Sequence, residues 1–308
     1  MFFLILRRII RAILVTIILS FIVFFIIRVI PGDPASLIAP MASEEVKESI
    51  REELGLKGPI INQYLSFISN VVKGDFGESI YYKESVVSLI FSVLPYTLVL
   101  ILGSFFISLL FSFTLGVLSS IRPGSIIDKI SFFISVLFMS IPNFWLAMVL
   151  ILVVAMHYKL LPGFGCNGWQ YFILPIITLT VTLIPVQLRT FRLSMEDILE
   201  EDFITFAKAR GVPNKIIIWT HAASNAIMPL ISILGVQIGI MLGTVIIVEY
   251  VFTFPGLGLM TLYAVQRRDY QLIQGLVVVF ALICTFVSTG VDIMQLLIDP
   301  RLRKGARL

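Results

Sequence analysis

Six long apolar stretches constrain this chain more than any other feature of its sequence. They lie at about 9–30, 93–118, 131–156, 171–190, 227–250 and 275–298. A helix needs about 20 mainly apolar residues to cross the hydrocarbon core of a bilayer, and each stretch reaches that length. Hydrophobic residues make up 58% of the chain and charged residues only 14%, against about 45–50% and about 25% in soluble domains. The sequence therefore predicts an all-α membrane protein with six transmembrane helices.

Lys and Arg side chains near the ends of these stretches predict the orientation of the chain. Arg7, Arg8 and Arg11 lie at the start of the first stretch, and further basic residues follow the second, fourth and sixth stretches. Because cytoplasmic loops are enriched in Lys and Arg, we expect both termini in the cytoplasm. The first stretch is longer than the roughly 7–15 apolar residues of a secretory signal, so we expect it to be a retained span.

The first external connection is too long to be a simple linker. Segments 43–54 and 59–73 within it have helical patterns, because apolar residues recur at i and i+4 in the first and a glycine follows the second. We therefore divide the chain into four parts. They are a cytoplasmic N-terminus with the first span (1–30), an extracytoplasmic helical loop (31–92), a five-span core that contains the connection at 191–226 (93–298) and a cytoplasmic tail (299–308).

Prolines lie at the starts of some spans and inside others. Pro95, Pro175 and Pro229 lie near predicted starts, where the first turn tolerates proline because its missing N–H would have no helical partner. Pro142 and Pro185 lie inside spans. We expect the helix to kink at both positions.

The sequence lacks the groups that ATP hydrolysis or other catalysis would need. A phosphate-binding P-loop requires Gly-Lys followed by Ser or Thr, and no glycine of this chain precedes a lysine. A G-x-G-x-x-G pattern at Gly163, Gly165 and Gly168 has no preceding strand, so it does not predict a dinucleotide site. His157 and His221 fall on opposite sides of the predicted membrane and cannot share a metal. We therefore expect no catalytic residue, metal site or cofactor in this chain.

Few polar side chains lie within the predicted spans. Gln187 and Gln237 are candidates for lining a solute pathway, because polar groups inside a membrane are retained for function or for pairing. Glu249 and Asp292 lie nearer span ends, and interfacial anchoring and helix pairing are both open as their roles. No inverted repeat or midplane ion site is evident, which disfavours a secondary transporter.

The connection at about 191–226 differs from the others because it is long, polar at its start and then amphipathic. Phe203, Phe206, Ala207 and Arg210 recur at helical spacing and predict a short helix with one apolar face. Such a helix suits the groove of a partner protein. The alternative is a helix that lies on the lipid surface.

Gly211 followed by Pro213 indicates the end of this short helix, and Asn214 is expected to cap a second one that runs through Trp219. The small side chains at Ala207 and Gly211 would let a partner approach closely. The residues expected to contact that partner are Phe206, Ala207, Lys208, Ala209, Arg210, Gly211, Val212, Pro213 and Lys215.

This connection, with Ala207, Gly211, Asn225 and Pro229, resembles the EAA loop of ABC importer permeases. Thr205-Phe206-Ala207 stand in place of Glu-Ala-Ala, as expected of the dipeptide/oligopeptide/nickel permease family. The resemblance extends over essentially the whole chain. It includes Pro31-Gly32-Asp33-Pro34, Gly74-Asp75-Phe76-Gly77-Glu78-Ser79, Ser140-Ile141-Pro142-Asn143-Phe144-Trp145, Glu249-Tyr250-Val251-Phe252, Phe254-Pro255-Gly256-Leu257-Gly258, Arg268-Asp269-Tyr270 and Asp299-Pro300-Arg301.

The resemblance implies a type I importer permease fold in the bacterial cytoplasmic membrane. It also implies a second homologous permease, two ATPase subunits that bind ATP and Mg, and an external solute-binding protein. We expect no nucleic-acid partner, because the basic residues are scattered at span ends rather than gathered on one face. Closure of the ATPase pair on ATP would pull on the docked loops and rock the spans between inward-open and outward-open states.

The substrate stays open between peptides and nickel or cobalt, either free or bound to a metallophore. The short connection at 161–170 is similar to that of nickel-type members, whereas peptide permeases often carry longer insertions there. A secondary transporter and a membrane enzyme are the alternatives from other functional classes.

Overall fold

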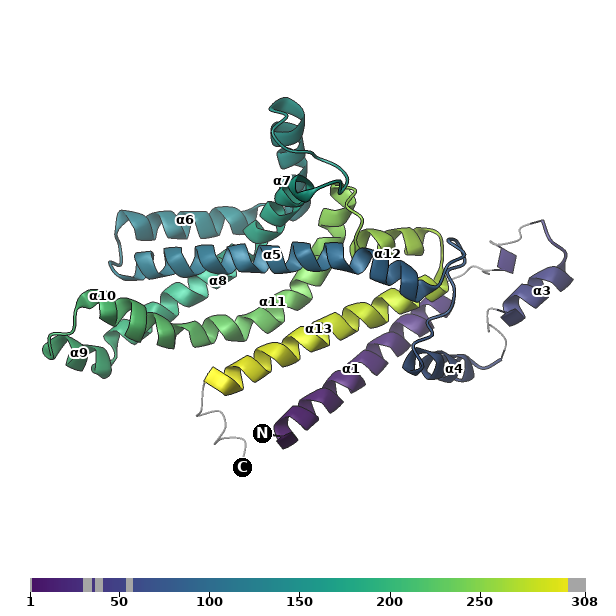
Figure 1. Ribbon diagram of the computed structural model, residues 1–308, viewed down its shortest axis with the longest axis horizontal. Helices are drawn as coiled ribbons and strands as arrows, with labels where there is room; N and C mark the ends of the chain where they lie inside the picture. The colour runs from purple at the N-terminus through teal and green to yellow at the C-terminus, as the bar shows by residue number, and fades with distance from the viewer. Residues whose placement is uncertain (1, 30–34, 37–40, 54–57, 299–308) are drawn as a thin grey trace.

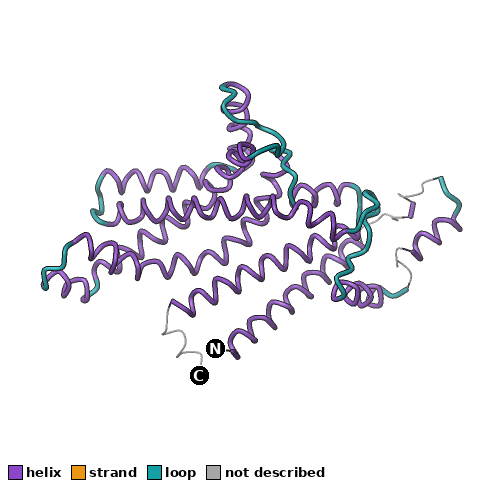
Figure 2. Tube along the Cα trace, in the orientation of Figure 1, coloured by secondary structure: helices purple, strands orange, loops and turns teal. Residues whose placement is uncertain are grey.

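The computed structural model describes residues 2–29, 35–36, 41–53 and 58–298. Within these ranges the ordered elements are helices, and Figure 2 draws no strand in them. In chain order they are α1 (Phe2–Val29), α3 (Glu44–Glu53), α4 (Ile60–Val72), α5 (Val86–Ser120), α6 (Ile126–Ser140), α7 (Asn143–Leu150), η1 (Ile151–His157), η2 (Trp169–Phe172), α8 (Ile173–Glu200), α9 (Asp202–Ala209), α10 (Asn214–Ile216), η3 (Ile217–Ala222), α11 (Ala223–Val251), α12 (Leu257–Gln266) and α13 (Tyr270–Ile298). The all-α class is confirmed. The tail at 299–308 and the motif at 31–34 lie outside the described residues.

The long helices run along one direction of the molecule (Figure 1). Among the described residues, five helices are long and apolar enough to cross a membrane, and a sixth crossing results if α6 and α7 form one bent span. The α5–α6 turn, α9 and α10 lie at one end of the molecule, whereas α3, α4 and α12 lie at the other. The connections that the sequence assigns to opposite sides of a membrane therefore lie at opposite ends of the structure.

The third predicted span is broken rather than kinked. α6 ends at Ser140 and α7 begins at Asn143, and the two helix axes differ by 97°. Pro142 has no N–H to donate and disfavours a helical conformation in the residue before it, and Ile141 accordingly has φ −92° and ψ 119°. The kink expected within 131–156 is thus a near-perpendicular break, and α7 projects away from the long helices in Figure 1.

The other prolines lie deeper in helices than the hydropathy pattern indicated. α5 begins at Val86, so Pro95 is internal. Pro229 is internal to α11 because the helix is continuous with α10 and η3 before it. Pro175 does lie in the first turn of α8, while Pro185 lies within the same helix, which continues past it. The sequence estimate missed these extensions because it counted only the roughly 20 residues that a span needs, whereas the helices continue beyond that length.

α5 and α8 pack closely because α5 carries a small residue at every fourth position. Ser104, Ser108, Ser112 and Gly116 form this stripe and are all buried. A Cβ atom added to Gly116 would lie 2.7 Å from the ring of Phe191 on α8. Small residues allow such close approach between membrane helices, where packing rather than hydrophobic burial drives association.

The segment between α1 and α5 contains two described helices, α3 and α4, close to the positions expected. α4 packs on α1 through Tyr64, which is buried against the rings of Phe21 and Phe24. The Tyr64 hydroxyl also lies 2.7 Å from the Ser20 hydroxyl and donates to the Ile17 carbonyl at 2.8 Å. These contacts attach this segment to the end of the first apolar helix.

Candidate coupling loop and solute pathway

The connection between α8 and α11 is almost entirely helical. α8 continues to Glu200, α9 follows, and only 210–213 separate α9 from α10. Pro213, with ψ 135°, is the last residue before α10, and no side chain caps that helix. The prediction that Asn214 is the N-cap was therefore wrong, because the extended conformation of Pro213 makes Asn214 the first helical residue.

Gly211 follows the end of α9, where the sequence predicted it, and its backbone has a left-handed conformation. Its φ is +75°, a region that residues with a Cβ rarely adopt. The Gly211 N–H donates to the Lys208 carbonyl at 3.0 Å, and the Val212 N–H donates to the Ala207 carbonyl at 3.1 Å. These two bonds form a Schellman motif, which reverses the chain sharply between α9 and α10.

α9 buries one side chain and exposes two aromatic ones. Ile204 is fully buried in a cluster with Met195 and Ile217. Phe206 is 70% exposed and Phe203 is 41% exposed. The helical spacing had placed both aromatic residues on one apolar face without showing whether that face points inward. In the structure neither Phe203 nor Phe206 belongs to the molecule's own core.

The remaining residues predicted to contact a partner differ in exposure. Ala207 and Val212 are half-buried and pack against the cluster around Ile204, so part of each side chain faces the molecule's own core. The others are exposed: Lys208, Ala209, Arg210, Gly211, Pro213 and Lys215. A Cβ added at Gly211 would meet nothing within 4 Å, so the described part of the chain leaves space for a side chain at this position.

Arg192 ties α8 to the start of α6. Its Nε donates to Asp128 Oδ1 at 2.6 Å and its Nη2 donates to Asp128 Oδ2 at 3.1 Å. The same guanidinium contacts Glu196 Oε1 at 2.9 Å, one turn further along α8. The Gly124 N–H also donates to Asp128. The sequence did not predict this Arg192–Asp128 ion pair, because two residues 64 positions apart give no local signal.

Gln187 and Gln237 meet between α8 and α11. The Gln187 amide donates to Gln237 Oε1 at 2.9 Å, and the Gln237 amide donates to the Leu183 carbonyl at 3.2 Å. Gln237 lines a groove of about 280 Å³ together with Thr182 and Thr244. Gln187 is fully buried and does not line that groove. Gln237 is also buried, at 5% exposure, but it is the one of the two predicted pathway residues that borders a groove.

Glu249 pairs helices at the end opposite to α9. Its carboxylate accepts hydrogen bonds from the Thr97 hydroxyl at 2.7 Å, the Gly258 N–H at 2.7 Å and the Leu259 N–H at 3.1 Å. The side chain is fully buried. Gly256 leaves the space that it occupies, since an added Cβ would lie 2.0 Å from a carboxylate oxygen. Of the two roles left open by the sequence, the structure shows helix pairing, between α11, α5 and α12.

Comparison with known proteins adds two family models and a set of relatives. The model for "Binding-protein-dependent transport system inner membrane component" matches residues 112–304, which include α9 and the groove. A model for the N-terminal part of such membrane components matches residues 1–101. The chain is also similar to the glutathione transport system permease protein GsiC of Escherichia coli (strain K12) and of Shigella dysenteriae serotype 1 (strain Sd197). Each is 36% identical over 278 residues, covering 90% of this chain and 91% of the relative.

The matched regions account for nearly the whole chain and agree with the membrane helices described above. Identity of 36% over this length is a family relationship rather than a shared motif. The chain therefore belongs to the family of inner-membrane components of binding-protein-dependent transport systems, as the permease subunit of a bacterial ABC importer.

Proposed function

We propose that this chain forms half of the translocation pathway of an importer for short peptides and that α9 with the Gly211 turn is its ATPase-docking element. The exposure of Phe206 carries the docking assignment. Aromatic side chains are enriched in the buried cores of protein interfaces, and Phe206 lies on a short helix that ends in a sharp turn. The exposed Lys208, Arg210 and Lys215 supply a charged rim.

The proposed assembly has a second permease of similar fold, two ATPase subunits and an external binding protein. α9 then faces the cytoplasm, and α3, α4 and α12 face outward, in agreement with the distribution of Lys and Arg. ATP hydrolysis belongs to the partner subunits, because this chain has no Gly-Lys phosphate loop. The groove at Gln237 is the part of the pathway contributed by α8 and α11.

Short peptides are the proposed substrates because the similar permeases are named for glutathione transport, and glutathione is a tripeptide. The nickel and cobalt alternative receives no support from these relatives. Within the described residues, no group of three or more His, Cys, Asp or Glu side chains could hold a metal ion. That observation does not decide the cargo, because the external binding protein performs most of the selection.

The docking proposal is tested by the variants Phe206→Asp and Lys208→Ala in the complete importer. Phe206→Asp places a charge in the proposed apolar contact while leaving the buried Ile204 side of α9 unchanged. We expect it to lower ATPase copurification and peptide uptake by about tenfold or more, as for loss of an interface anchor. Lys208→Ala is the matched control, because a rim charge contributes about 1 kcal/mol or less.

Equal copurification and uptake for Phe206→Asp and the unchanged protein, at equal expression, would show that α9 is not the docking element. The substrate is tested separately with importer reconstituted in vesicles. Uptake of labelled tripeptide but not of nickel ions supports the peptide assignment, and uptake of nickel alone contradicts it.

A further inference from the structure

The segment after Pro142 runs across the direction of the long helices. α7 and η1 together form a lateral helix (143–157), which projects sideways between the two ends of α5 (Figure 1). α6 lies alongside α5 and α8, and Ser140 ends it about 17 Å beyond Lys129 at about 1.5 Å per residue. The hydrocarbon core of a bilayer is about 30 Å thick. With Lys129 at the cytoplasmic surface, the lateral helix therefore starts inside the bilayer and, at 97° to α6, continues within it.

The lateral helix exposes an apolar stripe that no other part of the described chain covers. Large apolar side chains recur at every fourth residue along it, and they are Phe144, Met148, Leu152 and Met156. Their exposed fractions range from 48% at Phe144 to 63% at Leu152. Ala147 and Ile151, on the other side of the same helix, are buried. The helix therefore packs on its own molecule with one side and presents the other to its surroundings.

The return loop (158–168) that follows the lateral helix is polar in its backbone and in one side chain. Between Lys159 and Asn167, the N–H groups of Leu160 and Gly165 donate to carbonyl oxygens, and the remaining N–H groups have no partner in the described part of the chain. Lys159 is exposed. Irregular backbone and charged side chains at membrane depth are covered by protein or by a water-filled cavity. Lipid alone therefore does not suit this segment.

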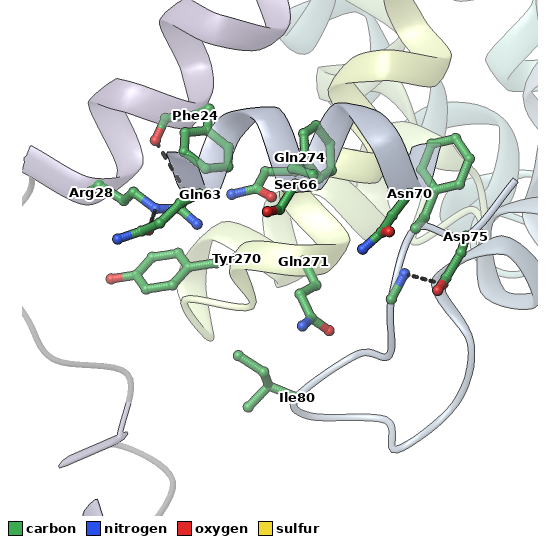
Figure 3. Close-up of a pocket in the computed structure, with 13 residues that line it drawn as sticks. Phe24, Arg28, Gln63, Ser66, Asn70, Asp75, Ile80, Tyr270, Gln271 and Gln274 are labelled. Carbon is green, nitrogen blue, oxygen red and sulfur yellow. Dashed lines mark hydrogen bonds between the residues drawn. The ribbon is translucent and has the colours of Figure 1, made fainter. Parts of the chain in front are cut away.

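The surroundings of the lateral helix must suit both its stripe and its return loop. Water would satisfy the loop but would leave the apolar stripe exposed. Another membrane-embedded subunit suits both, because it can cover the stripe while water reaches the loop beside it. The ATPases and the external binding protein of the proposed assembly lie in water on either side of the bilayer. The external protein meets a polar surface instead, and Figure 3 shows a pocket at that end lined by Arg28, Gln63 and other polar side chains.

The lateral helix begins beside the proposed solute pathway. Asn143 Oδ1 accepts a hydrogen bond from the Thr182 hydroxyl at 2.7 Å. Thr182 lines the same groove as Gln237. Because this chain is proposed to form one half of the pathway, the other permease lies across that groove. The lateral helix thus extends from the pathway toward the space that the second permease occupies.

We propose that the lateral helix is an interface with the second permease, which packs against the apolar stripe within the membrane. A hollow of about 450 Å³ beside the stripe, bordered by Tyr250 of α11 and Tyr263 of α12, receives side chains of that subunit. Methionine and aromatic side chains of this kind are enriched at protein interfaces. The inference rests on the proposed function, which supplies the second permease, but it does not depend on α9 docking or on the peptide assignment.

Site-specific cross-linking in the complete importer identifies what covers the stripe. The photoreactive amino acid p-benzoylphenylalanine replaces Leu152, and the illuminated complex is separated and mapped by mass spectrometry. We expect position 152 to cross-link to the second permease, whether that subunit is another copy of this chain or a related one. A cross-link only to lipid, only to α11 or α12 of the same chain, or only to the binding protein would overturn the proposal.

A truncation variant measures whether the contact holds the two permeases together. Leu152→Ala combined with Met156→Ala should lower copurification of the second permease by about tenfold or more, as for loss of interface anchors. Phe106→Ala is the matched control, because Phe106 is 70% exposed on α5 and lies outside the lateral helix. Equal copurification for the double variant and the control, at equal expression, would contradict the proposal.

The same samples distinguish failure of this inference from failure of the proposed function. If the stripe cross-links only to lipid while the second permease and the ATPases copurify and uptake continues, the importer assignment stands and the interface is elsewhere. If no second permease copurifies with the unchanged protein, the proposed assembly is wrong and the interface falls with it.

Discussion

Gly211 is the residue at which the conformation of the coupling loop is most sharply defined. Its φ of +75° is needed for the two hydrogen bonds that close α9. Because a Cβ at this position would touch nothing in the chain, the cost of a substitution within the chain is confined to backbone strain. A larger effect would support the proposed contact of a partner at this turn.

We predict different outcomes for Gly211→Asn and Gly211→Leu. Both should lower the free energy of unfolding by about 1 kcal/mol, with Asn at the lower end because it tolerates the left-handed conformation. Only Gly211→Leu should strongly weaken ATPase copurification, because its side chain would hold the two surfaces apart. Thermal unfolding and copurification are measured on the same samples. Normal assembly and uptake by Gly211→Leu would contradict the placement of the partner at this turn.

Glu249 illustrates a buried acid whose function is structural. Replacing it by Gln substitutes an amide N–H₂ for one acceptor oxygen, so at least one of the three donors around it loses its partner. A buried unsatisfied donor costs about 1–3 kcal/mol, and we predict a loss of stability of that order for Glu249→Gln. Thr97→Ser retains the hydroxyl and should change little. A thermal-unfolding midpoint for Glu249→Gln equal to that of the unchanged protein would show that the network contributes no stability.

Among the helices, α6 is joined to α8 by an ion pair at one end, and at the other end a sharp break separates it from α7. The Arg192–Asp128 pair fixes the α6 end near α9, and Pro142 ends the helix 97° away from its continuation. We therefore predict that, in the proposed transport cycle, α6 moves together with α8 while α7 keeps its own orientation.

A double-mutant cycle on Asp128→Ala and Arg192→Ala measures this link. The two side chains are 12% and 24% exposed, so solvent screens the pair only partly. Charge-assisted bidentate bonds of this kind suggest a coupling energy of about 1–3 kcal/mol. Lys129→Ala, beside the pair, should have an effect near zero. A coupling energy near zero would show that the Arg192–Asp128 pair does not stabilise the contact between α6 and α8.

The sequence predicts the positions of the helices better than it predicts the breaks within spans and the contacts between helices. Apolar length located the membrane helices, and Gly211 with Pro213 located the end of α9, because these signals are local. It did not predict that Ile204 rather than Phe206 faces inward, that Pro142 breaks the span, or that Gln187 is covered. Each of these depends on a neighbouring helix, and the partners of Asp128 and Glu249 lie 64 and 152 residues away.

At the scale of the whole molecule, the proposed orientation is tested by cysteine labelling. The background replaces Cys166 and Cys284 by Ser, and single cysteines are placed at Ser69 in α4 and at Arg122 in the α5–α6 turn, both exposed. An impermeant reagent added to intact cells should label position 69 and should label position 122 only after permeabilisation. The reverse pattern would mean that the chain is inserted the other way round.

The continuous helix from Asn214 to Val251 has a mechanical consequence. Its 38 residues span about 57 Å at about 1.5 Å per residue, so a tilt of about 10° at one end displaces the other by about 10 Å. The coupling turn lies at one end of this rod, Gln237 lies partway along it, and Glu249 lies at the far end. If the turn docks on the ATPase as proposed, we predict that this helix acts as a lever arm, so that a modest rotation at the ATPase displaces the far end by about the width of a small solute.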